Sequence, residues 1–467
     1  MTEGQANQST TRERKMSDKN VKTPKLLKQP LGRRDVIKRG LAGTVALAGA
    51  ATVLSPRRSY ASGAITIGSF QDNAMAPFRD YFVKEFTKET GIAVNYNETN
   101  YDTWYQNAKN DGINKTGAYD IYVMDDNWVP EFAAGGIVQS LDKLGLKVNS
   151  DILPKGLEMG LWPPKSGARM KDFASAKPEL YSLVIIDDVE ILYYHKDHFP
   201  HAPQTWDDIY AVAKKTEPPK MYGWSARGVK GNPIMMTYLP LLNSYGGNFV
   251  NEDWSPGFVG PEGVGALTRL FSFIPYMPSG VASFDTAEET QVMLEGKCTA
   301  LTEYTGLVNR VDDPSSSKVV HKINMTATPK QEKHGPAIGT FICGIASGSK
   351  NPEGAVQFLE WFTSSKTQMQ FARRFGGAAV TGSALSDPEA VKKYRWLPAI
   401  AEAVNSSVQK PRTPDEPKME DILGTALNEA LVEAIAQKEN YDAIAKKHLQ
   451  AAAEQISSYL KQQGGYF

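Results

Sequence analysis

The sequence YSLVIIDDVEILYY, residues 181–194, determines how this chain is organised. Its apolar character predicts a buried strand, but Asp187, Asp188 and Glu190 interrupt it, and a fully buried strand should contain no acids. A strand that passes between two lobes across a solvated cleft explains the interruption, because the acids then face water or a ligand. Two strands joined by an Asp-Asp turn are the alternative, although no Gly or Pro marks a turn there.

The residues upstream predict alternating strands and helices. Residues 65–67 and 92–96 are typical of strands, and they flank a helix over residues 77–90 in which aromatic side chains recur at helical spacing. Gly91 follows this helix, where a left-handed C-terminal cap belongs. A second helix and a strand over residues 120–124 complete a βαβαβ unit, so the chain begins as a parallel α/β sheet.

Polar and aromatic residues stand in the loops after these predicted strands. In an open α/β sheet such loops meet at the carboxyl ends of the strands and form the crevice where ligands bind. Asp and Asn at these positions also cap helices and form turns, but their recurrence after successive strands favours a binding site. The candidates from these loops are Gln71, Asp72, Tyr101, Asp126 and Trp128.

The second half of the chain supplies further candidates. The loop over residues 222–228 is flanked by glycines and presents Trp224 and Arg227. Residues 337–347 predict a short return strand, which we expect to make a second crossing between the lobes. The remainder is mainly helical, apart from the proline-rich loop over residues 411–417.

The N-terminal region predicts export. A twin arginine, Arg33-Arg34, precedes an apolar run over residues 41–54 and a small-residue cleavage site at residues 59–61. The apolar run is too short to span a bilayer of about 30 Å, and no cysteine near the site could carry a lipid. We therefore expect residues 1–61 to be a disordered leader plus a twin-arginine signal peptide, recognised by the twin-arginine translocase and then cleaved. The mature chain is expected to be soluble in the periplasm.

Composition limits the remaining classes. The residues after the signal exceed what one hydrophobic core usually supports, which predicts two lobes. Lys and Arg together number 52, as do Asp and Glu, and this balance gives no support to nucleic-acid binding. Two cysteines, Cys298 and Cys343, are too few for a disulfide framework, and both a bond between them and two buried thiols are open.

Motifs for catalysis and metal binding do not occur in the sequence. There is no P-loop, GxGxxG or zinc-protease motif, and no nucleophile stands beside a credible base. His195, His198 and His201 recur every third residue, but the segment is turn-like, so the three rings need not converge on a metal. We expect no cofactor, no metal and no catalytic residue.

Short segments in family order resemble the family 1 extracellular solute-binding proteins of ABC importers, in particular the sugar and polyol receptors. They are YDIYV (119–123), AAGGIV (133–138), LYYHKD (192–197), PQTWDD (203–208), SYGG (244–247), SKNPEGA (349–355) and PRTP (411–414). The resemblance implies the type II periplasmic-binding-protein fold: two α/β lobes, each a mainly parallel sheet flanked by helices, joined by a hinge of crossing strands. It places residues 62–186 and 338–382 in lobe 1, and residues 187–337 and 383–467 in lobe 2.

The resemblance also carries the family's ligand contacts to this chain. They fall at Asp72, Asp126 to Trp128, Asp188, Trp224 and Arg227, with Tyr304 and Phe341 as further candidates. Carboxylates accept hydrogen bonds from vicinal hydroxyls, a guanidinium donates in a fixed fork, and aromatic faces cover the C–H surface of a sugar. These residue types therefore fit a neutral polyhydroxylated ligand.

The function that the resemblance implies is that of a monomeric receptor. It captures a sugar or polyol between two lobes and delivers it unchanged to an ABC import permease. The acids Asp125, Asp126, Asp187, Asp188 and Glu190 leave a cationic solute such as a polyamine as an alternative. An exported glycoside hydrolase is the enzyme alternative, because paired carboxylates with aromatics in a cleft also cleave glycosidic bonds. A purely structural exported protein is the third, although it would not need acids and aromatics gathered at strand ends.

Overall fold

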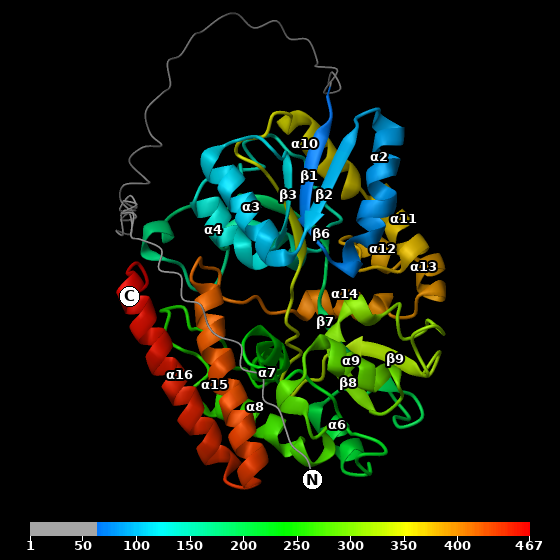
Figure 1. The fold of residues 1–467 in the computed structure, drawn as a ribbon, viewed down its shortest axis with the longest axis vertical. Helices are drawn as coiled ribbons and strands as arrows, with labels where there is room; N and C mark the ends of the chain where they lie inside the picture. The colour runs from blue at the N-terminus through cyan, green and yellow to red at the C-terminus, as the bar shows by residue number, and fades with distance from the viewer. Residues whose placement is uncertain (1–62) are drawn as a thin grey trace, which may run out of the picture. The chain divides into compact units, whose positions relative to one another are not determined.

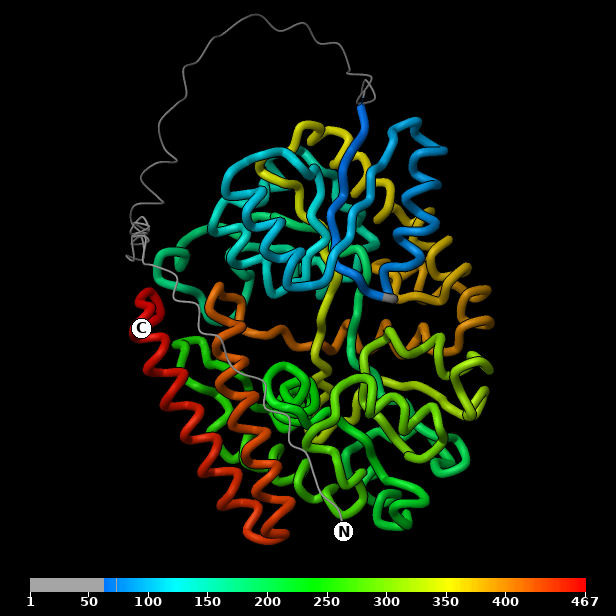
Figure 2. Tube along the Cα trace, viewed as in Figure 1, coloured from blue at the N-terminus to red at the C-terminus, as the bar shows by residue number. Residues whose placement is uncertain are grey.

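A computed structural model describes residues 63–467 of the chain (Figure 1). The expected signal peptide, residues 1–61, lies outside these described residues. Two main β-sheets form the framework of this part, and helices pack against each of them. Figure 2 shows the trace of the backbone, which passes from one sheet to the other and back.

The first sheet has five strands in the order β2-β1-β3-β10-β6. They are β2 (Val94–Thr99), β1 (Ile65–Phe70), β3 (Ile121–Asp125), β10 (Phe341–Ile345) and β6 (Ser182–Ile186). β1 pairs in parallel with β2 and β3, whereas β10 is antiparallel to β3 and β6. The parallel βαβαβ unit predicted at the start of this sheet is confirmed.

Helices cover this sheet, and two sequence features explain how they pack. The helices are η1 (Asn73–Met75), η2 (Phe78–Phe82), α2 (Val83–Thr90), α3 (Tyr101–Asn114), η3 (Asp126–Trp128), α4 (Val129–Ala134), α5 (Pro154–Glu158), α10 (Pro352–Phe362), α11 (Ser365–Phe375), α12 (Gly382–Leu385) and α13 (Pro388–Lys393). α3 approaches β1 so closely that a Cβ atom at Gly68 would lie 1.9 Å from the ring of Trp104. Gly91 ends α2 in the left-handed conformation, at φ 77°, as the sequence predicts.

The second sheet has three strands in the order β8-β7-β9. They are β8 (Ala300–Tyr304), β7 (Glu190–His195) and β9 (Ile323–Ala327), and both outer strands run antiparallel to β7. The expectation of a mainly parallel sheet is therefore wrong for this lobe. The cause lies in the connections, because β7 leads the chain away from the first sheet whereas β9 leads it back toward β10.

The helices around the second sheet include a long C-terminal pair. They are α6 (Trp206–Ala213), α7 (Asn232–Ser244), α8 (Pro261–Ser272), η5 (Ile274–Tyr276), η6 (Val281–Ser283), α9 (Thr286–Leu294), η7 (Thr305–Leu307), α15 (Glu416–Gln437) and α16 (Tyr441–Gln463). α14 (Leu397–Ser406) packs against β7 and β9 and also against α5 and α12, so it contacts both sides (Figure 1). The remaining elements are two short antiparallel strands, β4 (Leu161–Trp162) and β5 (Glu179–Leu180), and the short helix η4 (Lys171–Phe173) between them.

Three segments carry the chain between the two sides: residues 187–189, 328–340 and 407–415. The first joins β6 to β7, so the interrupted strand of the sequence belongs to two different sheets and the predicted crossing is confirmed. It lies beside the second, because Gly339 N donates to Asp188 O at 2.9 Å and Val189 pairs with Ile338. These paired segments form the hinge region.

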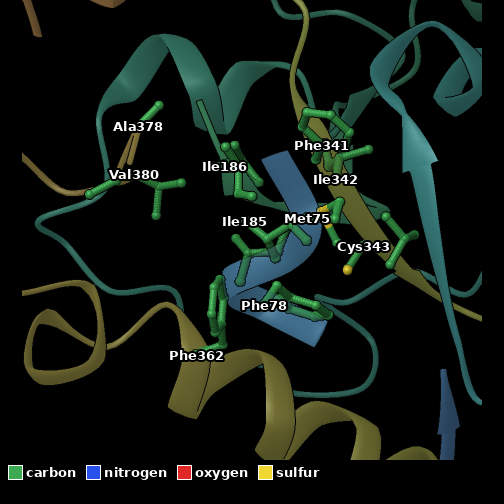
Figure 3. Packing of buried hydrophobic residues seen from close by; sticks show 14 of the residues in the cluster. Met75, Phe78, Ile185, Ile186, Phe341, Ile342, Cys343, Phe362, Ala378 and Val380 are labelled. Atoms are coloured by element: carbon green, nitrogen blue, oxygen red, sulfur yellow. The ribbon is translucent and has the colours of Figure 1, made fainter. Parts of the chain in front are cut away.

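Buried apolar side chains form two clusters. One packs around the first sheet, where Phe78 and Phe362 meet edge to face with ring centroids 4.8 Å apart, and it continues along one face of the second sheet (Figure 3). The other lies among α6, α7, α8, α15 and α16. β7 serves both, because Ile191 and Tyr193 belong to the first cluster and Leu192 and Tyr194 to the second, as the alternation of a strand requires.

The two cysteines of the chain do not form a disulfide bond. Cys298 and Cys343 are both buried and free, so no disulfide joins them. Within residues 63–467, no helix combines the length and the apolar character needed to cross a membrane.

Asp187 stands out at the end of β6, because it is fully buried and neither carboxylate oxygen has a hydrogen-bond partner among the described residues. Gly156 packs against it, and a Cβ atom there would lie 2.4 Å from Oδ1. Burial, and then the neighbouring charge of Asp188, raises the pKa of Asp187 to about 8. Asp187 is therefore neutral in the folded chain at neutral pH.

This burial predicts a pH-dependent effect of Asp187→Asn on stability. The folded chain holds a proton at Asp187 that the unfolded chain releases above the ordinary value of 3.8, so wild-type stability falls as pH rises toward 8. Relative to wild type, the free energy of unfolding of Asp187→Asn should rise by about 1.4 kcal/mol per pH unit between about pH 5 and about pH 7.5. Urea denaturation measures it, with the exposed Asp197→Asn as control. A difference that does not change with pH would contradict the assignment.

Candidate functional site

A cavity of about 400 Å³ lies at the hinge region, between the two sheets. The carboxyl ends of β1, β2 and β3 and the start of β10 contribute Phe70, Gln71, Asp72, Tyr101, Asp125, Asp126 and Phe341. The second-sheet side contributes Arg227, Asn232, Met236 and Tyr304, and the crossing segments contribute Asp188, Ile338, Gly339, Thr340 and Lys410. Both sides of the chain therefore build one site.

Most of the residues predicted from the sequence meet in this cavity. Those that line it are Gln71, Asp72, Tyr101, Asp126, Asp188, Arg227, Tyr304 and Phe341. Trp128 stands directly behind the lining, where its Nε1 donates to Tyr101 Oη at 2.9 Å. Trp128 thus positions a lining residue.

Trp224 does not reach the cavity, so its prediction as a ligand contact is wrong. It is fully buried in the second cluster, with its ring centroid 4.9 Å from that of Phe273 and 5.3 Å from that of Trp206. The segment that carries it runs beside β8, where Ser225 pairs with Leu301, so alternate side chains point to opposite sides. Arg227 reaches the cavity and Trp224 reaches the core.

Aromatic rings form the wall on the first-sheet side. Phe70 stacks on Phe341 with centroids 5.6 Å apart and meets Tyr101 edge to face at 5.1 Å. Tyr101 begins α3, whose N-cap Asn100 accepts a hydrogen bond from Thr103 N. Tyr101 as a whole remains 39% exposed. The wall offers an apolar face against which the C–H surface of a ligand can pack.

Asp126 anchors the floor of the cavity. It is 2% exposed, and Arg412 Nη1 donates to its Oδ2 at 3.1 Å and to its backbone oxygen at 2.8 Å. Its other carboxylate oxygen accepts from Thr340 N at 3.2 Å. Arg412 also donates to the carbonyl of Met159. The proline-rich loop over residues 411–417 is evident in the sequence, but nothing in it singles out Arg412 as a site residue.

Three further carboxylates face the cavity with only neutral hydrogen-bond donors. Asp125 accepts from Tyr101 Oη at 3.0 Å, Asp72 accepts from Ala74 N at 2.7 Å, and Asp188 accepts from the backbone and hydroxyl of Thr305. Burial, and secondarily the charge of Asp126, raises the pKa of Asp125 to about 7.

The same effect acts on Asp188. Burial raises its pKa to about 7, and the carboxylates of Asp72 and Glu303 add to the increase. Burial also raises the pKa of Asp72. The cavity is thus rich in carboxylates that gain from any donor that a ligand brings.

Arg227 is the cation on the second-sheet side, and two buried acids fix its orientation. Its Nε lies 2.8 Å from Glu289 Oε1 and 3.0 Å from Glu303 Oε2, and Nη2 donates to Glu303. Its guanidinium carbon lies 5.6 Å from the centroid of the Tyr304 ring. Among the described residues Nη1 has no acceptor, so this edge of the fork is available to a ligand.

Lys410 and Asn232 line the cavity but are missed by the sequence analysis. Lys410 Nζ lies 3.6 Å from Glu416 and 3.4 Å from Glu420, and Asn232 Nδ2 donates to Glu420 at 2.6 Å. The signal for Lys410 is its place directly before the proline-rich loop, and that for Asn232 is its place after Gly231 at the start of α7.

The histidine run does not form a metal site. His195 and His198 pack edge to face with ring centroids 5.2 Å apart, outside the cavity. In residues 63–467 no group of His, Cys, Asp or Glu side chains is arranged to hold a metal ion.

The cavity as a whole combines carboxylate acceptors, one guanidinium fork and aromatic faces. This combination supports the recognition of a ligand that carries hydroxyl groups.

Comparisons with known proteins agree with this geometry. The family model described as bacterial extracellular solute-binding protein matches residues 70–369. A probable amino-acid ABC transporter periplasmic-binding protein of Sinorhizobium fredii is 22% identical, over 70% of this chain and 74% of its own length. A mannitol-binding protein of Pseudomonas aeruginosa is 29% identical over 45% of this chain, and the match covers about half, 51%, of that relative.

Solved structures share the fold. A ribitol complex of an ABC transporter solute-binding protein from Agrobacterium radiobacter has a TM-score of 0.66 and 25% identity, and covers 85% of this chain and 100% of the other. A maltose-bound protein of Thermotoga maritima has a TM-score of 0.70 at 18% identity, with 85% and 100% coverage. The fold is that of type II periplasmic binding proteins, and the chain belongs to the bacterial extracellular solute-binding proteins, the non-enzymatic receptors of ABC importers.

Proposed function

We propose that this protein captures a small sugar or polyol in the hinge cavity and delivers it to an ABC import permease. The observation that carries the proposal is the composition of that cavity, where Asp188 on a crossing segment, Arg227 from the second-sheet side and Tyr101 from the first-sheet side face one space. Vicinal hydroxyls can donate to carboxylates and accept from the guanidinium, while C–H groups pack on the rings.

Two of the similar proteins reported above support the same ligand class, whereas the Sinorhizobium relative is named for amino acids. The names of the Pseudomonas protein and of the Agrobacterium radiobacter complex specify mannitol and ribitol. A further structure, from Agrobacterium vitis, holds D-mannitol and has a TM-score of 0.64 at 23% identity. The cavity of about 400 Å³ lies within the range of about 300–1,000 Å³ that is usual for small-molecule sites.

The proposal includes closure of two lobes around the solute. The first body comprises residues 63–186 and 341–393, the second comprises residues 190–327 and 416–467, and the three crossing segments act as the hinge. We place α13 in the first body because it packs on α11 and α12, whereas the resemblance assigns residues 383–467 to lobe 2. The predicted twin-arginine signal would bring the folded chain to the periplasm through the twin-arginine translocase, where it acts as a monomer.

A calorimetric titration with ribitol, D-mannitol and maltose tests the ligand class. At least one should bind with a dissociation constant near about 1 μM, which corresponds to about −8 kcal/mol and is within reach of several hydrogen bonds and two aromatic contacts. If neither these compounds nor a wider panel of sugars and polyols bind, the proposal fails.

Asp188→Asn tests the contact at the crossing. The variant replaces a charged acceptor by a neutral amide of the same shape, so the affinity for the neutral solute found above should fall about 10- to 100-fold. Asp197→Asn is the matched control, because that side chain is 69% exposed and lies after β7, outside the cavity. Equal affinities of Asp188→Asn and wild type would remove Asp188 from the binding site.

A further inference from the structure

The charges of the hinge cavity do not balance. Four carboxylates line it, those of Asp72, Asp125, Asp126 and Asp188, against the two cations Arg227 and Lys410. A neutral solute would leave this imbalance unchanged when the cavity closes and water is expelled.

Both cations already form ion pairs with glutamates that do not line the cavity. Arg227 lies against two buried glutamates, Glu289 and Glu303, and Lys410 lies against Glu416 and Glu420. Arg412, two residues after Lys410, forms an ion pair with Asp126. Among the described residues these cations make their ion pairs with other acids, and Lys410 acts on Asp125 only at longer range, where its charge lowers the pKa of that carboxyl.

Asp72, Asp125 and Asp188 have no ion-pair partner among residues 63–467. Their protein donors are a backbone amide, a phenol and a threonine. A cationic group in the cavity would offset these charges, because it would give each carboxylate a charge-assisted hydrogen bond that no described residue supplies. The gain is greatest at Asp125 and Asp188, which are partly buried, whereas Asp72 is exposed.

A second observation points to a hydroxylated ligand in the same space. Thr340 lines the cavity, is only 2% exposed, and its hydroxyl has no hydrogen-bond partner among the described residues. A buried hydroxyl of this kind gains a partner when a polar ligand binds. Within the described part of the chain, the cavity therefore presents a hydroxyl without a hydrogen-bond partner and three carboxylates without an ion-pair partner.

We propose that the preferred ligand is a polyhydroxylated solute that carries a protonated amine, such as an amino alditol or an amino sugar, with the amine bound among Asp72, Asp125 and Asp188. This inference rests on the proposed function, because it takes the hinge cavity as a site for polyols. The inference also predicts that acidic solutes do not bind, because a carboxylate on the ligand would be repelled by the same three acids.

Calorimetry with matched ligands tests it. Each of D-glucitol, D-mannitol and ribitol is compared with its 1-amino-1-deoxy derivative, with gluconate as the acidic analogue and putrescine as an amine without hydroxyls, at about pH 7.5 where alkyl amines are protonated. For the pair that binds, the amine should bind at least about tenfold tighter than the alditol, because a charge-assisted hydrogen bond is about twice as strong as a neutral one. Gluconate should not bind.

Variants locate the effect. Asp72→Asn and Asp125→Asn should each lower the ratio of amine to alditol affinity at least about threefold, whereas the exposed control Asp197→Asn should leave the ratio unchanged. A ratio is used because each variant can also weaken alditol binding.

The outcomes separate this inference from the proposed function. If an alditol binds as tightly as its amine, or if the variants leave the ratio unchanged, the amine preference is wrong and the polyol receptor stands. If nothing in this panel binds, the amine preference is wrong. If putrescine binds and no hydroxylated compound does, or if the wider panel of sugars and polyols also fails to bind, both are wrong.

Discussion

The arrangement of the crossing segments around the cavity depends on the ion pair between the buried guanidinium of Arg412 and Asp126. Arg412 sits on the third crossing segment and binds the carboxylate and backbone oxygen of Asp126 at the end of β3, and the carbonyl of Met159 next to α5. A buried charge without its partner costs several kcal/mol, so the segment cannot leave the first-sheet side without a large penalty. Arg412 thereby fixes Asp126, and Asp126 holds Thr340 on the second crossing segment through its backbone amide. One ion pair joins β3 to two of the three crossings.

The directions of the strands follow from these crossings and place the cavity. β6 leads out of the first sheet and β10 returns to it, so the two run antiparallel, and the same reversal makes the second sheet antiparallel. The parallel strands β1 and β3 end at this boundary, where their loops supply Asp72 and Asp125. Polar side chains that could not be buried inside either sheet are therefore gathered between the sheets. A receptor needs this arrangement, because a ligand held from both sides stabilises their approach and leaves when they separate.

Local patterns were sufficient to predict the parallel start of the first sheet, the crossing at residues 187–189 and the lining residues in the loops after the strands. Tyr304 and Phe341 were predicted only through the family resemblance, and about half of the cavity lining was predicted in all. Acids inside an apolar strand and polar residues after successive strands have few other physical explanations. Trp224 was assigned wrongly because the sequence of its loop does not show which alternate side chains face β8. Local patterns did not predict the antiparallel second sheet, or Lys410 and Arg412 as site residues, because these features depend on contacts between residues far apart in the chain. β7, for example, pairs with β8 and β9 more than a hundred residues later. The irregular segment around Lys410 has no periodicity to interpret.

The most direct measurement is a crystal structure of the protein with the tightest-binding polyol or amino polyol. The account predicts one ligand in the hinge cavity, within hydrogen-bond distance of Asp188 and Arg227 and packed against the ring of Tyr101, so that residues from both sheets hold it. A ligand bound to one side only, or bound outside this cavity, would contradict the central claim.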